Sequence, residues 1–303
     1  MRRGSTGLCG LLLVDKPAGM TSHDVVVAVR QATGEGRVGH AGTLDPAATG
    51  LLVVLIGAYT RLAPYLTAAR KRYEARIVFG VSTDTDDAEG DAVETAPVPD
   101  ALFDAASARD VLASMLGASR QVPPAYSAIK IAGRASHRVA RAGGVVDLAP
   151  RDVTVFDAQI LEVDPLSHSW DVAFDVSKGT YVRSLARDLG RKAGTVAHLA
   201  ALRRTASGPL RVEAAETLRS VIDAAGAGRL ASLFADPVTA LGLPSVEGDP
   251  ADVGNGRALP RSAAEDVGDG ERVAVLCDRR LKAVYLVAHD ALRAEAVFPE
   301  EAA

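Results

Sequence analysis

The stretch GHAGTLDPAATGLLVVLI, residues 39–56, decides the prediction of the fold. Its second part, residues 51–56, is a continuous apolar run whose length is typical of a strand buried on both faces. Its first part is a loop punctuated by glycine, which permits backbone angles that other residues avoid, and Pro46 confines Asp45 to extended conformations. The sequence therefore predicts a loop at the edge of a strand that presents Asp45 in a fixed direction.

Periodicity predicts strands and helices on either side of this loop. Residues 72–79 and 170–177 alternate apolar with polar side chains, which indicates two half-buried strands. A short apolar run over residues 10–14 indicates another strand, and Ser22 stands where the N-cap of a helix over residues 24–31 is expected. After residue 180, apolar residues share one helical face, while Arg183, Arg187 and Arg191 recur every four residues on another.

These elements together predict an α+β fold. Strands are interrupted by helices without a regular βαβ rhythm or a phosphate-binding glycine fingerprint, so we expect a mixed, mainly antiparallel sheet flanked by helices. From residue 241 the sequence becomes rich in Pro, Gly and Asp, and residues 272–277 and 282–288 look like short strands beyond it. We therefore expect a main domain over residues 1–240 and a small β-rich domain over residues 241–303.

The composition argues against several classes of protein. The apolar runs of this 303-residue chain are far shorter than the roughly 20 residues that span a membrane, and the N-terminus lacks the pattern of a secretion signal, so we expect a cytoplasmic protein. Cys9 and Cys277 have no metal-ligand spacing, and the six histidines are scattered. Neither a disulfide framework nor a metal site is predicted, so the chemistry should run on ordinary side chains.

Charge is unevenly distributed along the chain, although the net charge is only -4. Residues 121–151 contain five Lys and Arg against one acid, residues 178–204 contain seven against one, and six acids cluster in residues 84–94. Binding of nucleic acid depends on where charge lies rather than on its sum. Such runs also occur as solvated faces, but their clustering favours RNA as a partner.

On local chemistry alone, an Asp-Pro pair in a Gly-rich loop is usually a turn. The chain, however, closely resembles the bacterial TruB family of tRNA pseudouridine synthases. The segments that carry this resemblance occur in the family's order and are Gly10–Ser22, Gly39–Gly50 with Lys71–Tyr73, Pro123–Lys130, Ser177–Arg183 and Leu202–Arg204. The set is specific, because it extends in order from residue 10 to residue 204.

The resemblance implies catalytic roles for Asp45, Arg183 and Tyr73. Asp45 corresponds to the essential aspartate and Arg183 to the arginine paired with it, and a neighbouring guanidinium keeps a partly buried carboxylate ionised. Arg183 also falls in the first turn of its predicted helix, where cations are disfavoured, so it needs a compensating charge that Asp45 would supply. Tyr73 corresponds to the tyrosine that stacks on the target uracil and can move a proton.

The resemblance also implies residues that bind the substrate. Tyr181 and Leu202 correspond to residues that line the nucleotide pocket, with Leu202 as an apolar wall. His40 corresponds to the residue that fills the gap left when bases swing out of the T loop. Lys16 lies in a motif that we expect to support the floor of the pocket.

Two further regions follow from the resemblance. Residues 120–151 correspond to an insertion that closes over the tRNA arm, so we expect its cations to contact phosphates. Those cations are Lys130, Arg134, Arg138 and Arg141. The region after residue 240 resembles the family's PUA-like domain only weakly, which leaves its role in RNA binding open.

The implied reaction is the isomerisation of uridine 55 in the T loop of tRNA, which changes no redox state and adds no group, so no cofactor is expected. Asp45 could attack the sugar at C1′, add to the ring at C6, or remove the C2′ proton, and the sequence leaves all three routes open. The alternative is a non-catalytic RNA-binding chaperone, for which Asp45 would be dispensable. An aspartate-based hydrolase is disfavoured, because no second carboxylate or metal set is identifiable. We expect a monomer whose partner is the T arm of tRNA.

Overall fold

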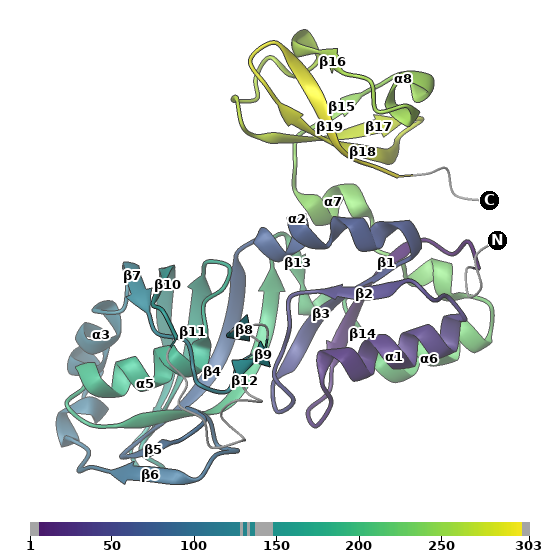
Figure 1. The fold of residues 1–303 in the computed structure, drawn as a ribbon. Coiled ribbons are helices and arrows are strands. Elements are labelled where there is room, and N and C mark those ends of the chain that lie inside the picture. Colours follow the sequence, from purple (N-terminus) through teal and green to yellow (C-terminus); the bar gives the residue numbers. More distant parts are fainter. Residues whose placement is uncertain (1–5, 128–129, 132–133, 137–147, 299–303) are drawn as a thin grey trace. The chain divides into compact units, whose positions relative to one another are not determined.

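The computed structural model describes residues 6–127, 130–131, 134–136 and 148–298 (Figure 1). The chain divides into two compact units, of which unit 1 comprises Met1–Pro46, Gly50–Ala69 and Ala206–Ala303, and unit 2 comprises Ala47–Thr49 and Arg70–Thr205. The chain therefore passes from one unit to the other directly after Asp45 and Pro46. The domain boundary expected at residue 240 stays a prediction.

The apolar run that follows the Asp45 loop forms a central strand, as predicted. β3 (Thr49–Ile56) pairs antiparallel with both β1 (Gly10–Lys16) and β2 (Val38–Ala41), and residues 51–56 are fully buried. β14 (Glu216–Thr217) runs parallel to β1 and extends this sheet of unit 1. Both faces of β3 are covered, which explains why its apolar run is continuous rather than alternating.

Helices cover the two faces of β1 and β3. On one face α1 (Ser22–Thr33) and α6 (Leu218–Gly226) lie side by side, and their apolar residues pack on Leu52 and Val54 (Figure 1). On the other face, Leu66 of α2 (Ala63–Ala68) belongs to the cluster that contains Leu51, Val53 and Leu55 of β3. Each fully buried aliphatic side chain contributes about 1.5–3 kcal/mol, so this core anchors the strand behind the Asp45 loop.

The start of α1 differs from the prediction by one residue. The N-cap is Thr21, whose hydroxyl accepts from the Asp24 backbone, while the Asp24 carboxylate accepts from the Thr21 backbone N–H at 2.8 Å. This reciprocal capping box needs an acid three residues after the cap, and Asp24 provides it for Thr21 rather than for Ser22. Ser22 instead exchanges two hydrogen bonds with the Leu44 backbone, at 2.8 and 3.1 Å.

The C-terminal part of unit 1 is rich in strands, as expected. Its five-stranded sheet has the order β15-β17-β18-β19-β16, with mainly antiparallel pairing. The strands are β15 (Ser245–Glu247), β16 (Leu259–Pro260), β17 (Arg272–Cys277), β18 (Arg280–Val287) and β19 (Ala291–Val297). The sequence predicted only β17 and most of β18, because the others are short or weakly patterned.

Unit 2 is built on strands in the order β12-β4-β11-β10-β7, and the pairings between β4, β11, β10 and β7 are all antiparallel. These strands are β4 (Lys71–Phe79), β7 (Gly117–Gln121), β10 (Arg151–Asp164), β11 (Ser169–Val176) and β12 (Ala197–Ser207). Every second residue of β4 is buried, which confirms the predicted alternation. The α+β class with a mainly antiparallel sheet is therefore correct.

Two helices, α3 (Ala105–Ala113) and α5 (Val182–Lys192), flank the sheet of unit 2 (Figure 1). The indole N–H of Trp170, in β11, donates to the Leu102 carbonyl at 3.1 Å, and its ring packs edge-on against Phe79. These buried aromatic residues hold β4 and β11 together on the side of the sheet that carries Tyr73.

Shorter elements complete the described part of the chain. The strands are β5 (Val81–Thr83), β6 (Ala92–Thr95), β8 (Lys130–Ile131), β9 (Arg134–Ala135) and β13 (Leu210–Arg211). The short α-helices are α7 (Pro237–Leu241) and α8 (Pro250–Gly254), and 3-10 turns include η1 (Gly57–Leu62). Within these described ranges no helix has the length and apolarity that crossing a bilayer requires.

Candidate active site

The loop that carries Asp45 is fastened to unit 1 by Lys16. The Lys16 side chain is fully buried, and its ammonium donates to the carbonyls of Pro17, Met20 and Pro46 at 2.8, 2.7 and 3.1 Å. The backbone N–H of Gly19 donates to the same Pro46 carbonyl at 2.9 Å. A buried ammonium must have such partners, because an unpaired one would be strongly destabilising. Lys16 thus fixes the backbone beside Asp45, and its place under the substrate pocket stays a prediction.

The other side of this loop is held by the Ser22 hydroxyl, which bonds to the Leu44 backbone next to Asp45. Gly42 and Gly50 adopt φ of 91° and 99°, which non-glycine residues rarely adopt, so these glycines are required where the loop turns. Asp45 itself is half-buried. The loop that carries Asp45 is therefore constrained on both sides in unit 1, and the catalytic role of its carboxylate stays a prediction. His40 lies near the start of the loop, in β2 opposite Val54.

In unit 2 the helix α5 carries the predicted arginines. It begins at Val182, so Arg183 lies in its first turn, as predicted. Leu185, Ala186 and Leu189 are buried, which confirms the packed face of the helix. Arg183 is only 5% exposed, whereas the side chain of Arg191 is 70% exposed. The cationic face is thus buried at its start and solvated at its end.

The guanidinium of Arg183 is fixed by partners on two different loops. It donates to the Thr85 carbonyl at 3.0 Å and to the Tyr126 carbonyl at 2.9 Å, and it lies 3.4 Å from an oxygen of Asp87. Asp87 thus supplies a negative charge beside Arg183, and the pairing of Arg183 with Asp45 stays a prediction. Two carbonyls and a carboxylate determine the plane of the guanidinium, because its N–H groups form a rigid fork.

Arg187 repeats this arrangement one turn later. It forms an ion pair of 2.8 Å with Asp86 and donates to the Val122 carbonyl at 2.9 Å and to Asp188 at 3.0 Å. Burial raises the pKa of the Asp86 carboxyl, and the positive charges of Arg187 and Arg183 counteract part of that rise. Asp86 adopts a φ of 60°, so the acidic turn is bent sharply where it meets the helix. Two acids of the cluster over residues 84–94, Asp86 and Asp87, therefore form ion pairs with the arginines of α5.

Tyr73 lies on the buried face of β4, opposite Phe174 of β11, and is 8% exposed. Two residues earlier on the same face, Lys71 is also buried. Burial, and secondly the positive charge of Arg204, lower the pKa of Lys71 from 10.5 to about 8. Two cationic residues thus lie close together inside unit 2 near the predicted catalytic tyrosine.

Leu202 lines a cavity of about 400 Å³ in unit 2, together with Ala47 and Thr49 of the segment that follows Asp45. The Thr49 hydroxyl donates to the Leu202 carbonyl at 3.5 Å. Leu202 and Tyr73 were both expected beside the uracil, but Tyr73 is not among the described residues that line this cavity. Tyr181 is the N-cap of α5, directly before the arginine helix.

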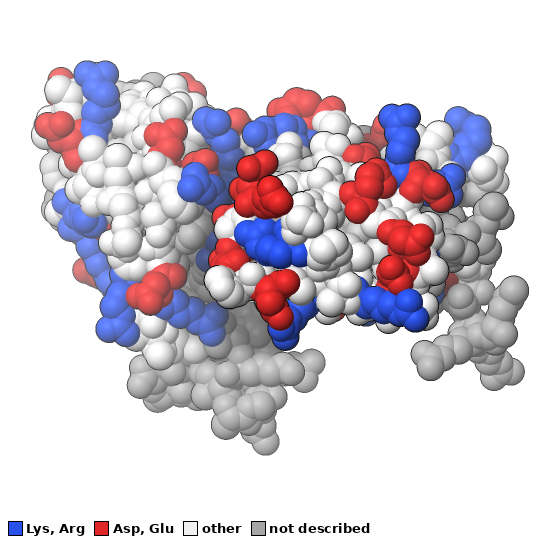
Figure 2. All heavy atoms as spheres, turned by 90° about the horizontal axis from the view of Figure 1, so that it is seen from above, with Lys and Arg blue, Asp and Glu red and all other residues white. Residues whose placement is uncertain are grey.

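The insertion is described only in part. The backbones of Lys130 and Arg134 lie in the paired strands β8 and β9, whereas Arg138 and Arg141 lie outside the described residues. Figure 2 shows one face of the molecule on which Lys and Arg are interspersed with Asp and Glu. On this face, the part of the chain that is drawn in colour has no continuous basic field.

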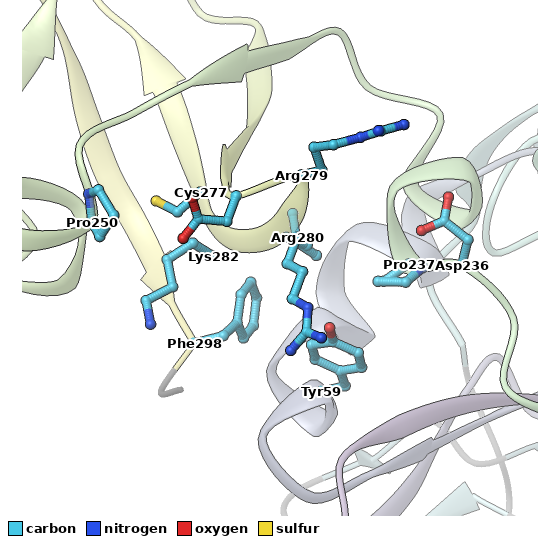
Figure 3. A pocket seen from close by; sticks show the side chains of 11 residues that line it. Tyr59, Asp236, Pro237, Pro250, Cys277, Arg279, Arg280, Lys282 and Phe298 are labelled. Atoms are coloured by element: carbon cyan, nitrogen blue, oxygen red, sulfur yellow. The ribbon is translucent and has the colours of Figure 1, made fainter. Parts of the chain in front are cut away.

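A second cavity, of about 770 Å³, lies in unit 1 beside the hairpin that joins β17 to β18 (Figure 3). Arg280 extends toward the ring of Tyr59, and Phe298 packs edge-on against the same ring. The two turn residues of the hairpin, Asp278 and Arg279, both have positive φ, of 51° and 61°, which a two-residue hairpin turn of this hand requires. The three cations that line this cavity are Arg279, Arg280 and Lys282.

The predicted site residues are divided between the units. Asp45, His40 and Lys16 lie in unit 1, and Tyr73, Tyr181, Arg183 and Leu202 lie in unit 2. The sequence interpretation missed Asp86 and Asp87 as partners of the arginine helix, although their acidic cluster was the signal that could have identified them. No group of three or more His, Cys, Asp or Glu that could hold a metal ion occurs in the described ranges.

Comparison with known families gives two consecutive matches. Residues 30–182 match the TruB family pseudouridylate synthase (N terminal domain), and residues 183–233 match the tRNA pseudouridylate synthase B C-terminal domain. The first match contains Asp45 and Tyr73, and the second begins at Arg183.

Curated relatives of the chain are named as members of the same family. The chain is 49% identical over 215 residues to tRNA pseudouridine synthase B of Thermobifida fusca, covering 69% of this chain and 73% of that protein. It is 39% identical over 289 residues to tRNA pseudouridine synthase B of Mycobacteroides abscessus, covering 92% and 95%. Among solved structures, a chain of a Cbf5-Nop10-Gar1 complex is 25% identical with a TM-score of 0.75, covering 96% of this chain and 85% of that one.

Proposed function

The chain belongs to the TruB family of pseudouridine synthases and isomerises uridine to pseudouridine in tRNA, and from this premise we propose that its target is uridine 55 of the T loop and that Asp45 is the catalytic carboxylate. A purely non-catalytic chaperone is not favoured by these relatives, all of which bear the name of the enzyme. Binding and refolding of a tRNA arm can still accompany the reaction, since they require only binding energy.

The observation that carries the proposal is the fixed guanidinium of Arg183. It is buried, and its direction is set by Asp87 and the carbonyls of Thr85 and Tyr126. A preorganised positive charge of this kind stabilises an ionised carboxylate or a developing negative charge without reorganising during the reaction. We propose that Asp45, held by Lys16 and Ser22 on its own unit, faces this charge when tRNA is bound.

The other residues take roles around the base in this proposal. Tyr73 stacks on the uracil with its hydroxyl available for proton transfer, while Tyr181 and Leu202 line the pocket. His40 occupies the space left in the T loop by the flipped uridine. Lys130, Arg134, Arg138 and Arg141 contact phosphates of the arm, which fixes its register without reading sequence. All three routes that begin at Asp45 remain compatible with this arrangement, and none calls for a cofactor.

The T arm is proposed as the part of tRNA that the enzyme recognises, and we expect a monomer to suffice because each unit contributes its residues within one chain. A T loop suits base flipping, because unstacking costs a few kcal/mol and less where bases are already unpaired. We place this activity in the cytoplasm, where its substrate tRNA is available. Light scattering of the protein with a T-arm hairpin would show a 1:1 complex if this holds and a larger one if a dimer is needed.

The proposal is tested by the variant Asp45→Asn, which keeps the shape of the side chain but removes its charge. With unmodified tRNA under single-turnover conditions, pseudouridine formation should fall by about four orders of magnitude or more, since the remaining contacts cannot supply the missing step. The tRNA Kd should change little. A rate comparable with the parent enzyme would refute the catalytic role of Asp45 and make binding alone the leading function.

A further inference from the structure

We propose that Gln121 is a positioning residue for the reaction, which fixes the backbone of Tyr181 and thereby aims the Tyr181 ring at the uracil. The side chain of Gln121 accepts from the Tyr181 N–H at 2.9 Å and donates to the Tyr181 carbonyl at 3.1 Å. A backbone N–H can only donate and a carbonyl can only accept, so these partners determine the orientation of the carboxamide. The inference rests on the proposed role of Tyr181 in the pocket.

The start of α5 shows why such support is needed. The helices α1, α3, α6, α7 and α8 begin with Thr or Asp side chains that bond to the first turn. The N-cap of α5 is Tyr181, which makes no such bond, and a tyrosine has no short acceptor with which to cap. A residue unsuited to capping therefore stands where the arginine helix begins, and Gln121 at the end of β7 holds its backbone.

Gln121 is itself rigidly placed. It is the last residue of β7, its backbone pairs with Arg151 of β10, and its side chain is 3% exposed. The Tyr181 carbonyl also accepts from the Leu185 N–H at 3.1 Å, so Gln121 bonds to the peptide group that opens the helix. Because both backbone groups of Tyr181 are held, the direction of its Cα–Cβ bond is fixed before the substrate arrives.

Two neighbouring hydrogen bonds make it possible to distinguish positioning of Tyr181 from merely holding β7 against α5. The Ser184 hydroxyl and the Arg187 guanidinium both donate to the Val122 carbonyl, at 3.0 and 2.9 Å. These hydrogen bonds join the residue after β7 to the same helix through the Val122 carbonyl rather than through the backbone of Tyr181. If Gln121 only held the junction together, removal of the Ser184 hydroxyl should be as harmful as removal of the Gln121 carboxamide.

The test is a double-mutant cycle between Gln121→Leu and Tyr181→Ala, with Ser184→Ala as the matched control. Single-turnover pseudouridine formation, tRNA Kd and urea unfolding are measured for each variant on the same unmodified tRNA. Gln121→Leu should slow the reaction about 10- to 100-fold, the size of effect that a small misplacement of a pocket group produces, with little change in Kd. Ser184→Ala should slow it no more than about 2-fold, and Gln121→Leu should have almost no further effect in the Tyr181→Ala background.

Equal fold-changes for Gln121→Leu in the two backgrounds would overturn the inference, as would an equal loss in Ser184→Ala. A parental rate in Tyr181→Ala would refute the pocket role of Tyr181 and the positioning role with it. If urea unfolding shows that Gln121→Leu does not fold, Gln121→Met, which keeps the length of the side chain, takes its place in the cycle. Failure of the wild-type enzyme to form pseudouridine on this tRNA would instead refute the proposed function, before any variant is compared.

Discussion

Helix α5 and the β17–β18 hairpin each present arginines, but under opposite conditions. Arg183 is buried in the first turn of the helix and Arg187 is half-buried one turn later, and both bond to carbonyls and acids on two loops. Arg279 and Arg280 are exposed beside the cavity of Figure 3. Fixing a long cationic side chain costs conformational entropy and desolvation. In α5 this cost is accompanied by a positive charge of defined direction, which the exposed hairpin lacks. The comparison shows a charge of fixed direction on α5, which is why we propose a catalytic role for Arg183 and none for the arginines of the hairpin.

The largest effect is expected for Arg183→Lys, which tests whether the fixed guanidinium matters for the reaction. Lysine keeps the charge but lacks the planar fork, in which one nitrogen of Arg183 faces Thr85 and Asp87 and the other donates to Tyr126. We expect single-turnover pseudouridine formation to fall by about 10²- to 10³-fold, the usual consequence of losing one preorganised electrostatic contact. Arg191→Lys, at the exposed end of the same helix, is the control and should retain the parental rate within about 2-fold. Similar rates in both variants would show that burial of the charge has no catalytic meaning.

The variant Tyr73→Phe tests whether the hydroxyl of this buried tyrosine takes part in the reaction. Phenylalanine keeps the stacking surface on β4 opposite Phe174, so only the hydroxyl is lost. We expect product formation to slow by about 10²-fold if that hydroxyl takes part in proton transfer, with unchanged tRNA affinity. A quench-flow measurement of single turnover would detect this change. Full activity would confine Tyr73 to stacking.

The burial of Lys71 should also change how the free energy of unfolding depends on pH. Its pKa of about 8 lies below the ordinary 10.5, so between these pH values the unfolded chain binds more protons than the folded one. The free energy of unfolding should therefore gain up to about 3 kcal/mol from this group as pH rises from 8 toward 10.5. Urea unfolding of Lys71→Met should lack that gain, while Lys178→Met, at an exposed position, should retain it. An identical pH dependence in all three proteins would contradict the lowered pKa.

The smallest effect is expected at the hairpin. Replacing both Arg279 and Arg280 with Ala should leave the single-turnover rate unchanged and the free energy of unfolding within about 0.5 kcal/mol, as is usual for exposed positions. The tRNA Kd should weaken by less than about 3-fold at moderate salt. A tenfold loss of affinity together with a flatter salt dependence would show that these two arginines contact phosphates. The hairpin would then have a defined role in binding, contrary to the difference from α5 described above.

Local patterns were sufficient to predict most of the elements that position the site. The apolar run of β3, the alternation of β4 and the amphipathic helix α5 are each encoded by neighbouring residues, so periodicity identified them. The cap of α1 was misplaced by one residue, because both Thr21 and Ser22 can cap and only the spacing to Asp24 decides between them.

Contacts between distant segments could not be predicted in the same way. Asp86 and Asp87 meet α5 across about 100 positions of sequence, and Gln121 meets Tyr181 across 60. No periodicity reports such a pairing, since it depends on how the acidic turn and β7 fold back onto the helix. The sequence indicated a need for compensation at Arg183, but only the fold identified Asp87 as a residue that meets it.

Mapping pseudouridine in unmodified tRNA after incubation with the purified wild-type enzyme tests most directly whether uridine 55 is the target. Position-specific chemical mapping should reveal one new pseudouridine, at position 55 of the T loop, and none elsewhere in the molecule. The same result should be obtained without any added cofactor or metal. Pseudouridine at another position, or none at all with correctly folded protein and tRNA, would contradict the assignment of this site to the T-loop uridine.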